Sequence, residues 1–111
     1  MVMKEKPDYA RHADETLNSL VRRLSAAGDD FGFQVSLDSG VLTIEFEGQE
    51  TPIVVTDHPG AGQLWLTFGA KKYKLDWDVV ENAFVLEATD QTVQELLEET
   101  ISRLVGDDVS F

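Results

Sequence analysis

The sequence contains no cysteine. It therefore has no thiolate and forms no disulfide, and zinc fingers and thiolate-bound iron–sulfur clusters are excluded. Catalytic signatures are missing too: there is no nucleophile elbow, HExxH helix, Walker loop or dinucleotide-binding glycine pattern. An enzyme that uses His12 or His58 is a weak alternative, because no motif surrounds either residue. We expect a protein that is not an enzyme.

Long apolar runs are also absent. No stretch approaches the roughly 18 apolar residues that cross a bilayer. Residues 1–15 carry mixed charges and lack the apolar segment of a secretory signal. These features predict a cytoplasmic protein that does not enter a membrane.

Basic residues are scarce. Nine Lys and Arg stand against 21 Asp and Glu, so the formal net charge is −12 over 111 residues. Nucleic-acid binding requires a basic surface and is excluded as the main activity. An anionic membrane surface would be repelled for the same reason. The charge favours cations, or a partner protein with a basic patch, and the length fits a single domain.

The first periodic segment predicts an amphipathic helix over residues 8–26, ended by Gly28. Residues 1–7 are expected to form a polar tail. From residue 33 the apolar period changes to two, which is typical of strands. Five strands are expected, with a sixth, short one after them, and residues 57–62 are expected to form a loop. The strands are predicted around residues 33–37, 42–46, 53–55, 63–68, 72–77 and 84–87.

A capping-box pattern at Thr92–Glu95 predicts a closing helix that ends at Gly106. The short connections between strands imply an antiparallel meander. The order helix, five or six strands, helix predicts an α+β two-layer sandwich whose sheet is covered on one face by the two helices. The folded domain should span residues 8–105, and residues 106–111 should form a C-terminal tail.

Acidic and imidazole side chains repeat along the first helix. Asp8, His12 and Glu15 fall on one stripe, and such a set can bind Fe²⁺ or Mn²⁺. The alternative is a solvated helix face with no ligand. Asp29 and Asp30, like Asp38, lie in or beside loops that can fold near this helix, although loop acids often serve as turn formers.

The strand over residues 63–68 predicts a partner surface. Leu64, Leu66 and Phe68 should face the helices, which places Gln63 and Trp65 on the open face of the sheet. An exposed tryptophan there is typical of an interface anchor, and the alternative is a ring buried by a loop or by sheet curvature. A basic cluster in the next hairpin is either a solubilising edge or a site for an acidic partner. This cluster consists of Lys71, Lys72 and Lys74.

Several motifs occur together, in order, in one known family. They are Tyr9–Leu20, Ser39–Ile44, Gln63–Leu66, Gly69–Tyr73, Asp76-Trp77 and Glu95–Leu97. The most specific is the Gln–aliphatic–Trp–Leu strand at Gln63–Leu66. Together they resemble the frataxin family, whose bacterial members are usually called CyaY. The resemblance covers about residues 8–105 and implies the same helix, meander, helix fold.

The resemblance implies an iron-binding accessory protein of iron–sulfur cluster assembly. Such a protein regulates, or supplies iron to, a complex of a cysteine desulfurase and a scaffold protein. Weakly bound Fe²⁺ or Fe³⁺ would lie on an acidic ridge, to which Asp14, Glu15, Asp29 and Asp30 correspond. Gln63 and Trp65 correspond to the positions that meet the scaffold. Lys72 stands where mitochondrial relatives have an arginine at the partner surface.

With the helix stripe added, the predicted metal ligands are Asp8, His12, Asp14, Glu15, Asp29 and Asp30. Catalysis would be limited to weak ferroxidase-type oxidation at surface carboxylates. We expect a monomer in the bacterial cytoplasm or, alternatively, a mature chain in the mitochondrial matrix. Arg22 and Arg23 stand where relatives carry acids, and residues 33–37 contain no acid, so the ridge should be shorter than usual.

The alternative function is an acidic domain similar to secretion chaperones, which bind an effector segment without metal chemistry. Those folds place a helix among the strands. The sequence shows no helical period between residues 33 and 88, which favours the frataxin-like interpretation.

Overall fold

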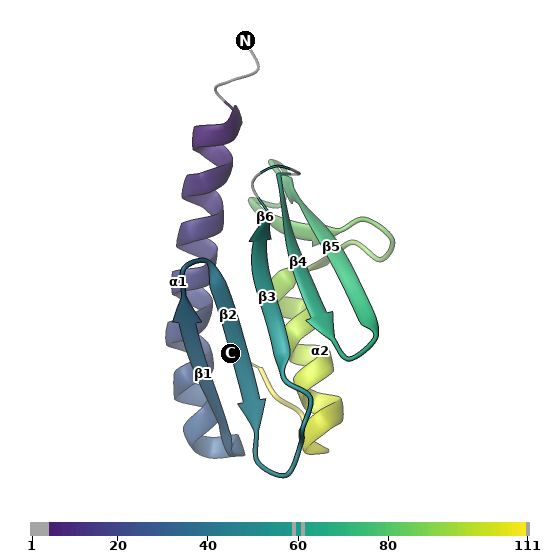
Figure 1. Ribbon diagram of the computed structural model, residues 1–111. Coiled ribbons are helices and arrows are strands. Elements are labelled where there is room, and N and C mark those ends of the chain that lie inside the picture. The colour runs from purple at the N-terminus through teal and green to yellow at the C-terminus, as the bar shows by residue number, and fades with distance from the viewer. Residues whose placement is uncertain (1–4, 59, 61, 111) are drawn as a thin grey trace.

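In the part of the chain that the computed structural model describes, two helices flank seven strands along the sequence. The described residues are 5–58, 60 and 62–110, and only the backbone is described for residues 5–10. The elements in chain order are α1 (Glu5–Phe31), β1 (Phe33–Asp38), β2 (Val41–Phe46), β3 (Ile53–His58), β4 (Gln63–Phe68), β5 (Lys71–Asp78), β6 (Ala83–Leu86), β7 (Gln91–Thr92) and α2 (Val93–Val105). Both helices pack on one face of the sheet, which confirms the predicted α+β sandwich (Figure 1).

The sheet is a meander, with strand order β1-β2-β3-β4-β5-β6-β7 and every neighbouring pair antiparallel. Each strand therefore pairs with the strand that precedes it in the sequence. The register of β3, β4 and β5 places Thr56, Trp65 and Lys74 side by side. Because side chains alternate along a strand, these residues lie on the face that the helices leave open.

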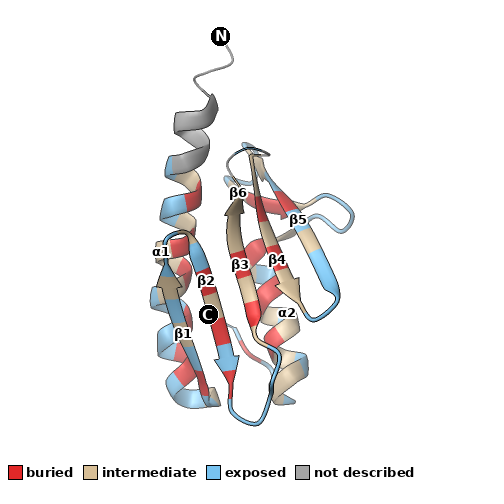
Figure 2. Cartoon of the chain, viewed as in Figure 1, coloured by how far each residue is buried: buried red, intermediate tan, exposed pale blue. Residues whose placement is uncertain are grey.

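The core lies between the sheet and the helices. Leu64 and Leu66 are completely buried, as predicted, and Phe68 packs against the same core at its margin. The predicted α1 residues whose side chains are described all line the core: Ala13, Leu17, Leu20 and Leu24. Ala27, beyond the predicted end of the helix, is buried there as well. Figure 2 shows the alternation of buried and exposed positions along the strands that this one-sided burial produces.

Helix α1 is longer than predicted at both ends. It already includes Glu5, within the predicted tail, and it passes through Gly28 to Phe31. A Cβ at residue 28 would overlap the backbone carbonyl oxygen of Phe33, so Gly28 is needed for close packing and not for ending the helix. Gly32, with φ of +78°, ends α1 instead.

Three other differences occur outside the core. Strand β3 continues to His58, into the predicted loop, and β7 is an additional two-residue strand. The predicted C-terminal tail is partly packed, because Val109 is buried and exchanges two hydrogen bonds with the Ser102 hydroxyl. Helix α2 has the predicted bounds and the complete capping box.

Candidate functional site

The open face of the sheet is centred on Trp65, a half-buried residue in the middle of β4. The neighbouring residues in the sequence, Leu64 and Leu66, are at 0% exposure beneath it. A slip of one residue would exchange these two sets, so the predicted register of β4 is confirmed. The indole is neither buried in the core nor fully exposed, because side chains from β3 and β5 pack against it.

The indole ring contacts three side chains from the neighbouring strands. The His58 ring stacks on it with centroids 3.7 Å apart and planes 22° from parallel. The ammonium groups of Lys72 and Lys74 lie 4.9 and 4.7 Å from the ring centroid, within the range of cation–π attraction. This arrangement brings two cations to one aromatic ring in a chain of net charge −12. In the described part of the chain neither lysine lies in an ion pair with an acid.

Hydrogen bonds fix the orientation of the ring. Trp65 Nε1 donates to Gln63 Oε1 at 2.9 Å, and Gln63 Nε2 donates to Asp76 Oδ1 at 3.1 Å. On the other side His58 Nε2 and Thr56 Oγ1 share a hydrogen bond of 2.9 Å. The indole therefore has a defined position before any partner binds, which lowers the entropic cost of binding. We call Thr56, His58, Gln63, Trp65, Lys72, Lys74 and Asp76 the Trp65 surface.

His58 was not predicted as part of the partner surface, and Lys74 was predicted only as a member of the basic cluster in the hairpin after β4. The signal for Lys74 was its pairing directly opposite Trp65, which follows from the turn at residues 69–70. His58 pairs with Gln63 and is diagonal to Trp65, but only because β3 extends beyond the strand that the sequence predicted.

His12 does not lie on a solvated face of α1, which corrects the interpretation of the helix stripe. Its ring stacks on Trp77 of β5, with centroids 3.7 Å apart and planes 9° from parallel. Trp77 in turn meets Phe84 of β6 edge to face at 5.1 Å. His12 therefore packs α1 against the sheet, because the flat face of the imidazole ring covers the indole.

The predicted metal ligands do not converge in the described structure. Asp14 and Glu15 are exposed on α1, whereas Asp29 and Asp30 are exposed near its C-terminal end. At 1.5 Å per residue the two pairs are about 22 Å apart along the helix. The Asp8 side chain lies outside the described residues. Among the side chains that are described, no three His, Cys, Asp or Glu residues are grouped as a metal site would require.

A groove of about 500 Å³ separates α1 from β6 and the start of α2. His12 and Trp77 line one part of it, and Arg23 spans another part, where its Nη1 donates to Gln94 Oε1 at 2.8 Å. Arg23 was predicted to interrupt an acidic ridge. In the structure it also connects the two helices.

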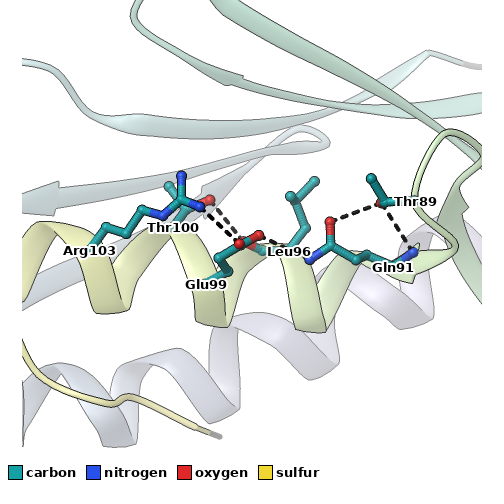
Figure 3. A network of polar contacts seen from close by, with 6 residues as sticks. All are labelled: Thr89, Gln91, Leu96, Glu99, Thr100 and Arg103. Atoms are coloured by element: carbon teal, nitrogen blue, oxygen red, sulfur yellow. Dashed lines mark hydrogen bonds and ion pairs between the residues drawn. The ribbon is translucent and has the colours of Figure 1, made fainter.

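The acids of α2 are partly engaged in local contacts. Glu99 accepts hydrogen bonds from Gln91 and Arg103, each at 3.0 Å, and Thr89 donates to Gln91 at 2.9 Å (Figure 3). These bonds tie the second turn of α2 to β7 and to Thr89 in the turn before β7. The charge of Glu99 therefore contributes to local structure. Neither helix of the described chain has the length and apolar character of a membrane-spanning segment.

Comparison with known families gives a direct assignment. The model of a family described as "Frataxin-like domain" matches residues 2–107. The chain belongs to the frataxin family. The alternative of a domain similar to secretion chaperones is wrong, because the chain matches this family over most of its length and the described strands follow one another with no helix among them.

Relatives of this frataxin-family chain include plant and bacterial proteins. It is 25% identical over 111 residues to "Frataxin, mitochondrial" of Arabidopsis thaliana, an alignment that covers 96% of the chain and 59% of that protein. It is 29% identical over 85 residues to "Iron-sulfur cluster assembly protein CyaY" of Pseudomonas syringae pv. syringae, covering 75% of the chain and 76% of that protein. It is 24% identical over 101 residues to the protein of the same name from Thioalkalivibrio sulfidiphilus, covering 91% and 94%.

A solved structure supports the fold. Frataxin from Psychromonas ingrahamii superposes with a TM-score of 0.76 over 95% of each chain, at 15% sequence identity. At this identity the likeness concerns the fold alone. The chain spans 59% of the length of the plant frataxin, so that protein includes further residues that have no counterpart here.

Proposed function

We propose that this frataxin-family protein is an accessory protein of iron–sulfur cluster assembly. It docks on a complex of a cysteine desulfurase and a scaffold protein, and it regulates that complex or supplies it with iron. The family assignment and the names of the bacterial relatives support this proposal. Its action is that of a binding protein and not of an enzyme. A monomeric state and a cytoplasmic location, with the mitochondrial matrix as the alternative, remain predictions.

The observation that carries the proposal is the Trp65 surface. A half-buried indole on an open sheet face offers the large, rigid apolar area that is typical of interface anchors. The hydrogen bonds and ring contacts around it hold this anchor ready for a partner. The net charge of −12 attracts a basic partner from a distance, whereas Lys72 and Lys74 provide a local region of opposite sign.

Binding kinetics with the desulfurase–scaffold complex of the same organism test the proposal. We expect Trp65→Ala to raise the dissociation constant at least thirtyfold, about 2 kcal/mol, mainly through faster dissociation. Asp14→Asn with Glu15→Gln should slow association, and this effect should shrink as salt rises. Thr43→Ala, on β2 of the same open face, is the matched control and should bind like the wild type.

Two results would contradict this account of docking. One is a folded Trp65→Ala protein that binds the complex as tightly as the wild type. The other is a wild-type chain that does not bind the complex at low salt.

We propose that iron is bound weakly, at the acids of α1. Asp8, His12, Asp14 and Glu15 belong to one end of the helix and Asp29 and Asp30 to the other, so no closed ligand set is formed in advance. Exposed carboxylates leave water molecules on the ion, which predicts dissociation constants on the order of micromolar or weaker. The stacking on Trp77 covers one face of the His12 ring and limits how that ring can turn toward a metal ion.

Paramagnetic line broadening in NMR spectra, with Mn²⁺ or anaerobic Fe²⁺ as the probe, tests the metal assignment. We expect the amide signals around residues 8–15 to broaden first, and those around residues 29–30 next. Mg²⁺, which is diamagnetic, serves as the control for shifts caused by charge alone. Broadening confined to residues 95–99 of α2 would show that the wrong acids were chosen.

A further inference from the structure

The turn between β5 and β6 exposes two adjacent valines. Val79 is 81% exposed and Val80 is 87% exposed, far more than Val41 at 38%, the third large apolar side chain that is exposed in the described structure. The other large apolar residues that the structure describes are buried or half-buried. Folding therefore gains nothing from the apolar character of Val79 and Val80, and a binding role accounts for it.

The turn has a fixed shape. Asp78 Oδ1 accepts hydrogen bonds from the backbone amides of Val80 at 2.8 Å and Glu81 at 3.2 Å, which is an Asx turn. Asn82 follows with a positive φ of 55°, a conformation that asparagine tolerates better than most residues. The two valines are thus held outward by the backbone of the turn. A preformed apolar projection of this kind loses little entropy when it binds.

The charges around the valines indicate the kind of surface that they meet. Asp76 and Glu81 are exposed beside the turn, and residues 75–102 include no Lys, Arg or His. An acidic partner surface would be repelled. A complementary surface has an apolar recess with Lys or Arg at its rim.

The turn lies at the end of the strand that carries Lys72 and Lys74. Lys74 is paired with Trp65, and Asp78 is four residues further along β5, about 13 Å at the usual rise of a strand. Interfaces of standard size bury about 800 Å² on each partner, which is wide enough to include both features.

We propose that the Val79–Val80 turn is a second docking element, which inserts into an apolar recess with a basic rim on the same protein complex that meets the Trp65 surface. This inference rests on the proposed function. The Trp65 surface, opposite the middle of β5, and the turn at the end of β5 then form two separate apolar anchors, the first in contact with Lys72 and Lys74 and the second followed by Glu81. This arrangement determines the orientation of the protein on its partner, because rotation would bring like charges together.

The test uses substitutions that keep the shape of the turn. Val79→Thr with Val80→Thr replaces one methyl group of each valine by a hydroxyl, and we expect the dissociation constant for the purified desulfurase–scaffold complex to rise about tenfold. Val79→Ile with Val80→Ile stays apolar and should bind within twofold of the wild type. Glu81→Lys should slow association severalfold at low salt and much less at high salt. The denaturation midpoint of each variant should remain that of the wild type, because none of these side chains contributes to the core.

The outcomes separate this inference from the proposed function. If the wild type binds, Trp65→Ala weakens binding and the threonine variant binds like the wild type, the turn is not a docking element and the proposed function stands. If the threonine and isoleucine variants are weakened equally, apolar contact is not the cause and the inference is overturned. A wild-type chain that does not bind the complex overturns the proposed function and this inference with it.

Discussion

Two glycines four residues apart have different roles in this protein. Gly28 has helical neighbours on both sides, and its missing side chain leaves room for the carbonyl of Phe33, where the chain returns as β1. Gly32 has open space around it, and its role is the positive φ that lets the chain leave the helix. The same residue type thus serves packing at one position and backbone conformation at the other.

Helix propensity alone predicts that Gly28→Ala stabilises α1. The close approach of Phe33 to Gly28 predicts the opposite. Gly28→Ala should destabilise the protein by about 2 kcal/mol, because the added methyl group forces α1 and β1 apart. Gly32→Ala should cost only about 1 kcal/mol, the strain of a left-handed alanine. Chemical denaturation of both variants measures the two free energies. A Gly28→Ala protein that is more stable than the wild type would mean that the close approach to Phe33 is absent in solution.

At the scale of single elements, each strand has one buried and one open face. Leu66 and Thr67 are neighbours on β4, yet Leu66 is completely buried under the helices and Thr67 lies on the open face. Each helix likewise has one apolar face, which packs on the sheet. Helix α2 also has a defined start at Thr92.

Substitutions on β4 should therefore differ sharply in their cost. Leu66→Ala should lower the free energy of unfolding by about 3 kcal/mol, through lost apolar contact and an unfilled cavity. Thr67→Ala should lower the free energy of unfolding by less than about 1 kcal/mol, because alanine is only somewhat less favoured than threonine in a strand. Urea denaturation of the pair measures the difference, and similar costs at the two positions would disprove the register of β4.

The start of α2 gives a second prediction at this scale. Thr92 Oγ1 accepts a hydrogen bond from the Glu95 amide at 3.2 Å, and Glu95 Oε1 accepts one from the Thr92 amide at 3.0 Å. Thr92→Ala should cost about 1 kcal/mol, while Thr92→Ser, which keeps the hydroxyl, should cost much less. Thermal or urea denaturation distinguishes the two variants. An equal loss in both would assign the effect to the methyl group and not to the cap.

At the scale of the whole molecule, charge is the dominant feature. The net charge is −12 on 111 residues, so the carboxylates repel one another in the folded state. The described acids are spread over helices, strands and turns. The repulsion acts over long distances at low ionic strength, where the Debye length is about 30 Å at 0.01 M salt, and it is reduced when that length falls to about 8 Å at 0.15 M.

Stability should consequently rise with added salt. The denaturation midpoint should increase between about 0.01 and 0.15 M sodium chloride and level off above that range, because screening relieves the repulsion among the acids. A chain in which several exposed acids of β2 and the following turn are neutralised, Glu45→Gln, Glu47→Gln and Glu50→Gln, should show a smaller increase. A midpoint that does not change with salt would mean that the acids are already compensated in the folded state.

The fold could be predicted because its signals are local. Alternation identified β1, β2, β4 and β5, and the capping box and Gly106 gave both ends of α2. The assignments that were wrong depend on contacts between distant segments. The role of Gly28 depends on Phe33 across a tight turn, the position of His12 depends on Trp77, and the end of β3 depends on pairing with β4.

The same distinction applies to the candidate site. The position of Trp65 on the open face followed from alternation within one strand. The side chains that cover its ring, His58 and Lys74, come from the two neighbouring strands, so they require the register between strands as well. Among the predicted metal ligands, Asp8, His12 and Glu15 were chosen from their spacing on one helix, and Asp14, Asp29 and Asp30 from the family resemblance. Neither argument shows whether separated acids meet.

The strict sequence order of the strands has a consequence for how the chain folds. Every strand pair joins consecutive strands, so the sheet can grow one hairpin at a time with only short loops to close. The contact that spans the chain is the meeting of α1 and α2 on the finished sheet, which includes the hydrogen bond between Arg23 and Gln94, 71 residues apart. Because α1 also packs on β1, the next element in the sequence, the topology favours early local contacts, with the hydrogen bond between α1 and α2 formed last.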